Sequence, residues 1–91
     1  MELTKSERKL MTEIIRRGIL RRCEEWLLET KQLIEKSYND ENAFDRCMEV
    51  TKRSRNFFKE AMQREEYYKT SQMLTGASVL LAEGYLSEDD L

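Results

Sequence analysis

The chain has 91 residues, a formal net charge of −2, and 37% charged against 40% hydrophobic residues. A chain of this length forms one domain with a thin core, because it buries only a little over ~60% of the surface that its unfolded form exposes. The lack of proline and the presence of only three glycines favour long helices over disorder or a turn-rich β fold. With no overall positive field, binding to nucleic acid or to an anionic membrane would require a local patch.

The first predicted helix covers about residues 5–37. Thr4-Lys5-Ser6-Glu7 has the spacing of a capping box, in which the threonine hydroxyl and the glutamate each accept a free amide hydrogen at the helix start. Further along, apolar residues recur in steps of three and four, which keeps them on one broad face of a helix. The members of this face are Met11, Ile14, Ile15, Gly18, Ile19, Cys23, Trp26, Leu27, Leu33 and Ile34.

The residues from Ser37 to Asn42 are mostly short and polar and predict a turn at about 38–42. A second helix is then predicted over about 43–74. A series of apolar residues with several small or polar members alternates strictly in steps of three and four, which is the heptad-like pattern of a coiled-coil seam. This seam comprises Phe44, Cys47, Thr51, Ser54, Phe58, Ala61, Glu65, Tyr68 and Gln72.

Two helices of equal length joined by a short connection are expected to lie antiparallel, so the predicted fold is all-α, a long coiled-coil-like helical hairpin. With the turn centred near position 40, residues whose numbers total about 80 should face each other. Large residues then meet small ones, as in interdigitated layers. The rule sets Trp26 against Ser54 and Gly18 against Met62.

The composition changes after Leu74. Gly76 either closes the second helix or lies within a helix that continues through it, and both alternatives stay open. A short C-terminal helical segment is predicted at about 77–83, with Gly84 at its end. Residues 85–91 are expected to form a frayed acidic tail, so that residues 1–91 make a single helical domain.

Catalysis is disfavoured because the sequence contains no histidine, the commonest general base and metal ligand. The two cysteines, Cys23 and Cys47, lack the C-x-x-C spacing of redox or zinc sites and are expected to be unpaired core residues. The longest apolar run, 79–82, is too short to cross a bilayer. We therefore expect a non-enzymatic cytoplasmic protein that uses no metal and no cofactor.

Both helices carry more apolar residues than a two-helix seam can bury, which predicts another layer of structure. We expect a homodimer that forms a four-helix bundle, or a groove that takes a helix of another protein. The function predicted from this surplus is protein–protein interaction or assembly. The candidate interaction residues are Trp26, Leu27, Phe57, Phe58 and Met62.

The alternative is a small nucleic-acid-binding regulator that uses a basic patch on such a dimer. The pairing rule brings cationic residues of the two helices near one another. They are Arg16, Arg17, Arg21, Arg22, Lys59 and Arg64. Nucleic acid is the less favoured partner, because glutamates interleave with these cations within a Debye length of ~8 Å and weaken the field of the patch.

Overall fold

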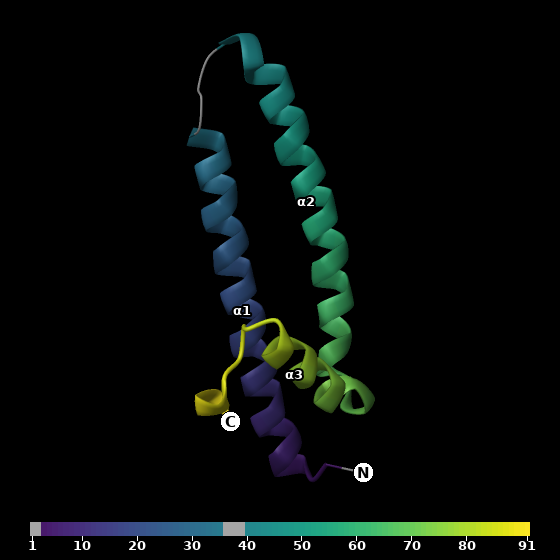
Figure 1. The fold of residues 1–91 in the computed structure, drawn as a ribbon. Coiled ribbons are helices and arrows are strands. Elements are labelled where there is room, and N and C mark those ends of the chain that lie inside the picture. The colour runs from purple at the N-terminus through teal and green to yellow at the C-terminus, as the bar shows by residue number, and fades with distance from the viewer. Residues whose placement is uncertain (1–2, 36–39) are drawn as a thin grey trace.

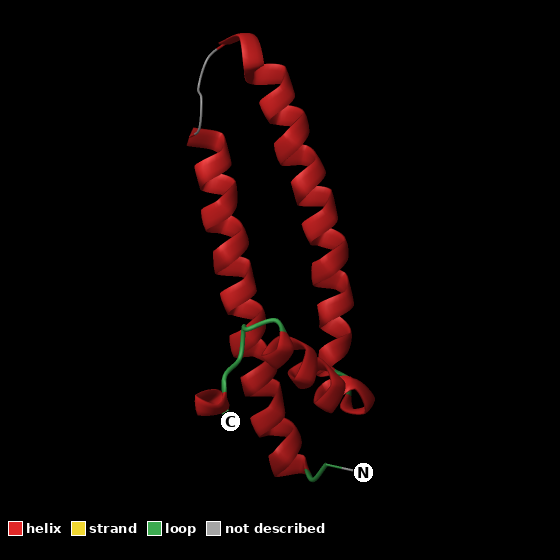
Figure 2. Cartoon of the chain, viewed as in Figure 1, coloured by secondary structure: helices red, strands yellow, loops and turns green. Residues whose placement is uncertain are grey.

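The computed structural model describes residues 3–35 and 40–91, and within these ranges every regular element is a helix. The predicted all-α class is therefore confirmed (Figure 2). The long helices α1 and α2 run side by side in opposite directions, and α3 lies across one end of the pair (Figure 1). The helices are α1 (Lys5–Glu35), α2 (Ala43–Glu65) and α3 (Met73–Ala82), with short 3₁₀ helices at Asp40–Asn42, Glu66–Tyr68, Thr70–Gln72 and Glu88–Asp90.

Helix α1 begins at the predicted capping box. The Glu7 amide donates to the Thr4 hydroxyl at 3.1 Å, and the Thr4 amide donates to the Glu7 carboxylate at 3.0 Å. The last described residue of α1 is Glu35, so the predicted helix end near 37 and the first part of the turn lie outside the described residues.

Helix α2 ends at Glu65, so the prediction of one helix over about 43–74 is wrong. The backbone becomes extended at Lys69, with φ −73° and ψ 135°. The Tyr67 side chain then packs on Gly76, where a Cβ atom would lie 2.4 Å from the tyrosine Cγ. The glycine therefore lies inside α3, where its missing side chain makes room for the ring.

The hydrophobic core lies at the α3 end of the molecule instead of along the whole length of α1 and α2. Its buried members come from α1, α3 and the C-terminal segment: Ile14, Ile15, Met73, Ala77, Leu80 and Leu86. At Gly18, a Cβ atom would lie 3.1 Å from side-chain atoms of both Leu80 and Leu86. The predicted contact of Gly18 with Met62 is therefore wrong, because this glycine admits the C-terminal segment.

The C-terminal segment is folded against α1, which corrects the prediction of a frayed tail at 85–91. Gly84 ends α3 with a φ of +87°, a conformation that suits glycine. The amides of Tyr85 and Leu86 donate to the Leu80 carbonyl at 2.9 and 3.2 Å. These bonds turn the chain so that the Leu86 side chain enters the core.

Candidate interaction surface

Ion pairs and one aromatic stack join α1 to α2. They include Arg22 with Glu60 at 2.8 Å, Arg53 with Glu29 at 3.0 Å, and the Trp26 ring stacked on the Phe57 ring with centroids 4.7 Å apart. The residue numbers of these pairs total 82, 82 and 83, which is close to the predicted register. Trp26 nevertheless contacts Phe57 where the prediction placed Ser54 opposite it. A stacked pair of this kind contributes ~0.5–1.5 kcal/mol beyond the area it buries.

The cationic residues of the predicted nucleic-acid patch are divided among separate contacts. Most of them have acidic partners in the chain: Arg17 and Arg21 pair with Asp90, Arg22 with Glu25 and Glu60, and Arg64 with Glu60 and Glu83. Arg16 and Lys59 are exposed and have no ion pair among the described residues. The arginines thus serve largely to join α1, α2, α3 and the C-terminal segment.

Arg64 is the most buried of these cations, with 6% of its surface exposed. Its guanidinium donates to Glu83 at 3.0 and 3.2 Å and to Glu60 at 3.4 Å, and it lies over the Tyr85 ring. Burial alone would lower the pKa of Arg64, but the hydrogen bonds and charges of both glutamates raise it. This arrangement is that of a structural cross-link, because a phosphate could reach the guanidinium only by displacing a glutamate.

Asp90 fastens the C-terminal segment to α1. Its carboxylate accepts hydrogen bonds from Arg21 at 2.7 and 2.9 Å, from Arg17 at 3.3 Å and from the Ser87 amide at 2.8 Å. The hydrogen bonds from Arg21 and the Ser87 amide hold the pKa of this carboxyl well below its usual range. Such a group stabilises the fold above its unfolded pKa of ~3.9, and the contribution is lost as the pH falls toward its folded pKa.

Replacement of Asp90 by asparagine should therefore release residues 85–91 from α1, since an amide cannot bridge two guanidinium groups as a carboxylate does. We expect faster amide hydrogen exchange at Tyr85 and Leu86 while the middle of α1 is unchanged. Asp89→Asn is the matched control, because Asp89 is exposed and makes none of the ion pairs found among the described residues. Equal exchange in the two variants would contradict the role given to Asp90.

The predicted coiled-coil seam of α2 does not face α1. Phe44 and Phe58 are 74% and 65% exposed, and Cys47, Thr51 and Ser54 between them are exposed as well. The side of α2 that contacts α1 carries Arg53, Phe57 and Glu60 instead. Cys47 is thus a free surface thiol, which corrects its assignment to the core, and Cys23 is free and half-buried.

Helix α1 carries a matching series of apolar residues in steps of three, four and seven: Leu20, Cys23, Leu27 and Ile34. Leu27 is 61% exposed, and Leu20 and Ile34 are about half exposed. Of the predicted interaction residues, the structure therefore places Leu27, Phe58 and Met62 on the surface, whereas Trp26 and Phe57 contact each other between the helices.

The exposed series of α1 and α2 lie on the same side of the molecule. Near one end, Ile34 lines a hollow together with Cys47 and Thr51. Near the other end, burial raises the pKa of Tyr68, and the charge of Arg16 on α1 opposes the rise. We define the apolar face by residues Leu20, Cys23, Leu27, Ile34, Phe44, Cys47, Phe58 and Met62.

The opposite side of the helix pair is polar. Asn56 is two residues from Phe58, so at 3.6 residues per turn the two side chains point to opposite sides of α2. Asn56 lines a hollow with the residues of the α1–α2 contacts, namely Arg22, Trp26, Glu29, Arg53, Phe57 and Glu60. The helix pair thus has one side rich in ion pairs and one side rich in exposed hydrocarbon.

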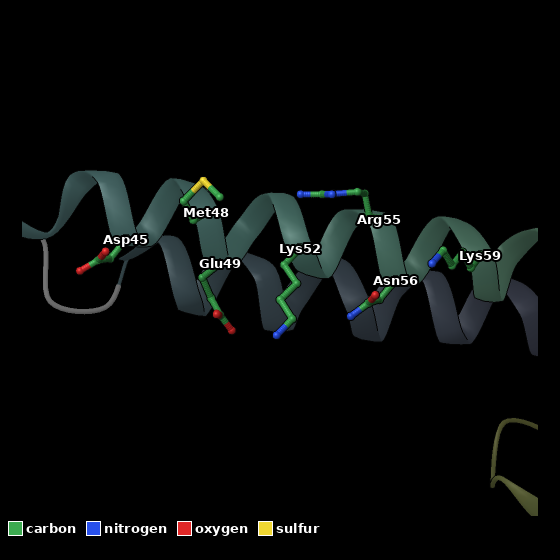
Figure 3. A pocket seen from close by; sticks show the side chains of 7 residues that line it. All are labelled: Asp45, Met48, Glu49, Lys52, Arg55, Asn56 and Lys59. Carbon is green, nitrogen blue, oxygen red and sulfur yellow. The ribbon is translucent and has the colours of Figure 1, made fainter.

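A shallow furrow follows the outer surface of α2, and Figure 3 shows that all its labelled side chains come from this one helix. Its lining residues are Asp45, Met48, Glu49, Lys52, Arg55, Asn56 and Lys59. All of its lining residues belong to α2, so it is an open surface with three cations and two carboxylates. The three cations Lys52, Arg55 and Lys59 form a basic rim beside the apolar face, which is separate from the paired arginines.

Other kinds of site find no support in the described residues. Among them, no cluster of three or more acidic or cysteine side chains is placed to hold a metal ion. Within the same residues, none of the helices combines the length and the apolar character that a membrane span needs. Comparisons with protein families, with curated proteins and with solved structures found no match to this chain.

Proposed function

We propose that this protein is a non-enzymatic assembly module, an antiparallel helical hairpin whose apolar face binds a second copy to form a homodimeric four-helix bundle. The observation that carries the proposal is the exposure of the apolar face on both long helices. Soluble monomers rarely expose large contiguous apolar patches, and those that exist usually mark an interaction site. The heptad-like spacing of the face is the pattern that helix-on-helix packing uses.

The dimensions of the face suit such a partner. From Phe44 to Met62, α2 rises ~27 Å at ~1.5 Å per residue, and each helix is ~10 Å wide. The projected area of the apolar face over both helices is therefore roughly 500 Å². Because side chains protrude from this plane, the accessible area of the face approaches the ~800 Å² per partner of a standard interface. A second hairpin matches this length and width, whereas a single helix would cover only half of the width.

The ion pairs of the arginines favour this proposal over nucleic acid binding. Phosphate contacts would have to replace the acidic partners of Arg17, Arg21, Arg22 and Arg64. Each replacement would return a carboxylate to water at the expense of a contact that holds the fold together. We therefore expect no salt-sensitive, sub-micromolar binding of RNA or DNA.

The test compares two double variants of equal polarity. Leu27→Gln with Phe58→Gln removes two large side chains from the apolar face, while Leu10→Gln with Leu28→Gln removes two leucines that are 60% and 57% exposed elsewhere on α1. Size exclusion with light scattering should report a dimer for the unmodified chain and for the Leu10/Leu28 variant, and a 10.9 kDa monomer for the face variant. If both variants stay dimeric, or both dissociate alike, the apolar face is not the assembly surface.

A further inference from the structure

We infer that the two copies pack with their Asp40–Asn42 ends side by side, so that α1 of each chain lies against α2 of the other. This inference rests on the proposed function and specifies how the apolar face recognises its partner. It follows from the symmetry of the face, from the sizes of the side chains at two of its central levels, and from the charges along its edges.

A two-fold axis can bury the apolar face against itself in two ways. An axis parallel to the helices keeps the same ends together and places α1 on the partner's α2. An axis across the helices reverses one copy and places each helix on its own counterpart. Only the axis parallel to the helices leaves every residue at the same position along the helix direction. The register within one chain, in which the numbers of facing residues total about 82, then also holds between the two chains.

Applied between chains, this register pairs a large residue with a small one at two central levels of the face. Leu27 lies level with the partner's Ser54, and Cys23 lies level with the partner's Phe58. Each large side chain thus enters the space over a small one, as the interdigitated layers of a bundle require. All four positions lie on exposed or half-buried parts of α1 and α2.

The charges at the edges of the face favour the same arrangement. Arg16 and Glu65 are exposed at the same end of the face, and their numbers total 81, so each would meet its opposite charge on the partner. Along the outer edge, Glu24 of α1 would lie beside the partner's Arg55 and Lys59.

The reversed arrangement brings like charges together. It sets α2 against α2, so Lys52 and Arg55 in the basic rim of one copy meet those of the other near the middle of the interface. This rim consists of Lys52, Arg55 and Lys59. Contact between like charges costs free energy, so it disfavours the reversed arrangement of the two copies.

The experiment is disulfide cross-linking between two singly marked chains, both carrying Cys23→Ser and Cys47→Ser. One chain also has Leu27→Cys and the other Ser54→Cys; they are mixed, allowed to exchange subunits, and oxidised. We expect covalent dimers in the mixture and none above background in either chain alone, because a disulfide needs Cα atoms within ~7 Å. Asn56→Cys, on the polar side of α2, replaces Ser54→Cys as the control and should give no cross-link.

The outcomes separate the two proposals. Self-cross-linking of the Leu27→Cys chain would indicate α1 against α1 and overturn the inferred arrangement while leaving the assembly function standing. Absence of any cross-link in a mixture that light scattering shows to be dimeric would also overturn the arrangement. A monomeric state of the unmodified chain, measured alongside by light scattering, would overturn the assembly function itself.

Discussion

Replacement of Leu80 by alanine should lower the free energy of unfolding by ~2–5 kcal/mol, the range for removing a large aliphatic side chain from a close-packed core. Leu80 is 0% exposed, packs over Gly18, and belongs to the same core cluster as Ile15, which is also 0% exposed. The total stability of a domain is only ~5–15 kcal/mol, and this chain is small, so the loss would be a large share of it. Urea denaturation followed by far-UV circular dichroism measures the change.

The matched control is Leu74→Ala in the same helix, because Leu74 is 48% exposed. Its cost should stay within ~0.5 kcal/mol, as for most surface substitutions. Similar losses in the two variants would contradict the placement of the core between α1, α3 and the C-terminal segment.

Replacement of Arg64 by alanine should cost ~2–3 kcal/mol, the second large effect. Removing one partner of a fully buried ion pair costs ~3–5 kcal/mol, and the partial exposure of Glu60 and Glu83 reduces this through solvent screening. The variant also loses the contact of the guanidinium with Tyr85. Thermal and urea denaturation both report the change.

Two further variants identify the origin of that effect. Arg64→Lys keeps the charge but loses the planar fork that binds Glu83 through two nitrogens, so we expect an intermediate loss. Arg55→Ala removes an exposed arginine from the same helix and should leave stability nearly unchanged. A loss at Arg55 as large as that at Arg64 would show that the loss comes from overall charge and not from the cross-link.

Local sequence signals predicted the parts of the fold that local interactions determine. The all-α class followed from the composition, the start of α1 from the Thr4–Glu7 capping box, and the end of α3 from Gly84. The end of α2 was not predictable in this way, because the spacing of apolar residues continues past Glu65. What turns the chain there is the contact of Tyr67 with Gly76, which no single-helix pattern contains.

The C-terminal segment was missed for a related reason. Its acidic composition is typical of a solvated tail, but Leu86 and Asp90 find partners on α1 more than sixty residues away in sequence. The small residue at Gly18 and the arginines at 17 and 21 were visible signals of that docking. These residues identify the docking site only when the turn after Gly84, which directs the C-terminal segment toward α1, is already known.

The apolar face shows both the strength and the limit of periodicity. The three- and four-residue steps placed Phe58 in a seam that was expected to face α1, whereas the structure places Phe58 on the surface together with Leu27 and Met62. Periodicity could not decide whether Phe57 or its neighbour Phe58 faces α1, because both are large and apolar. The stack with Trp26 and the ion pairs on either side of it favour Phe57, which leaves Phe58 exposed.

Sedimentation equilibrium of the unmodified chain at micromolar concentration tests the central proposal most directly, because mass is measured without reference to shape. This matters for a molecule of 57 × 24 × 18 Å, whose elongation distorts size estimates from elution volume alone. Assembly through the apolar face predicts a single species of about twice 10.9 kDa. A species of 10.9 kDa at every concentration would contradict it.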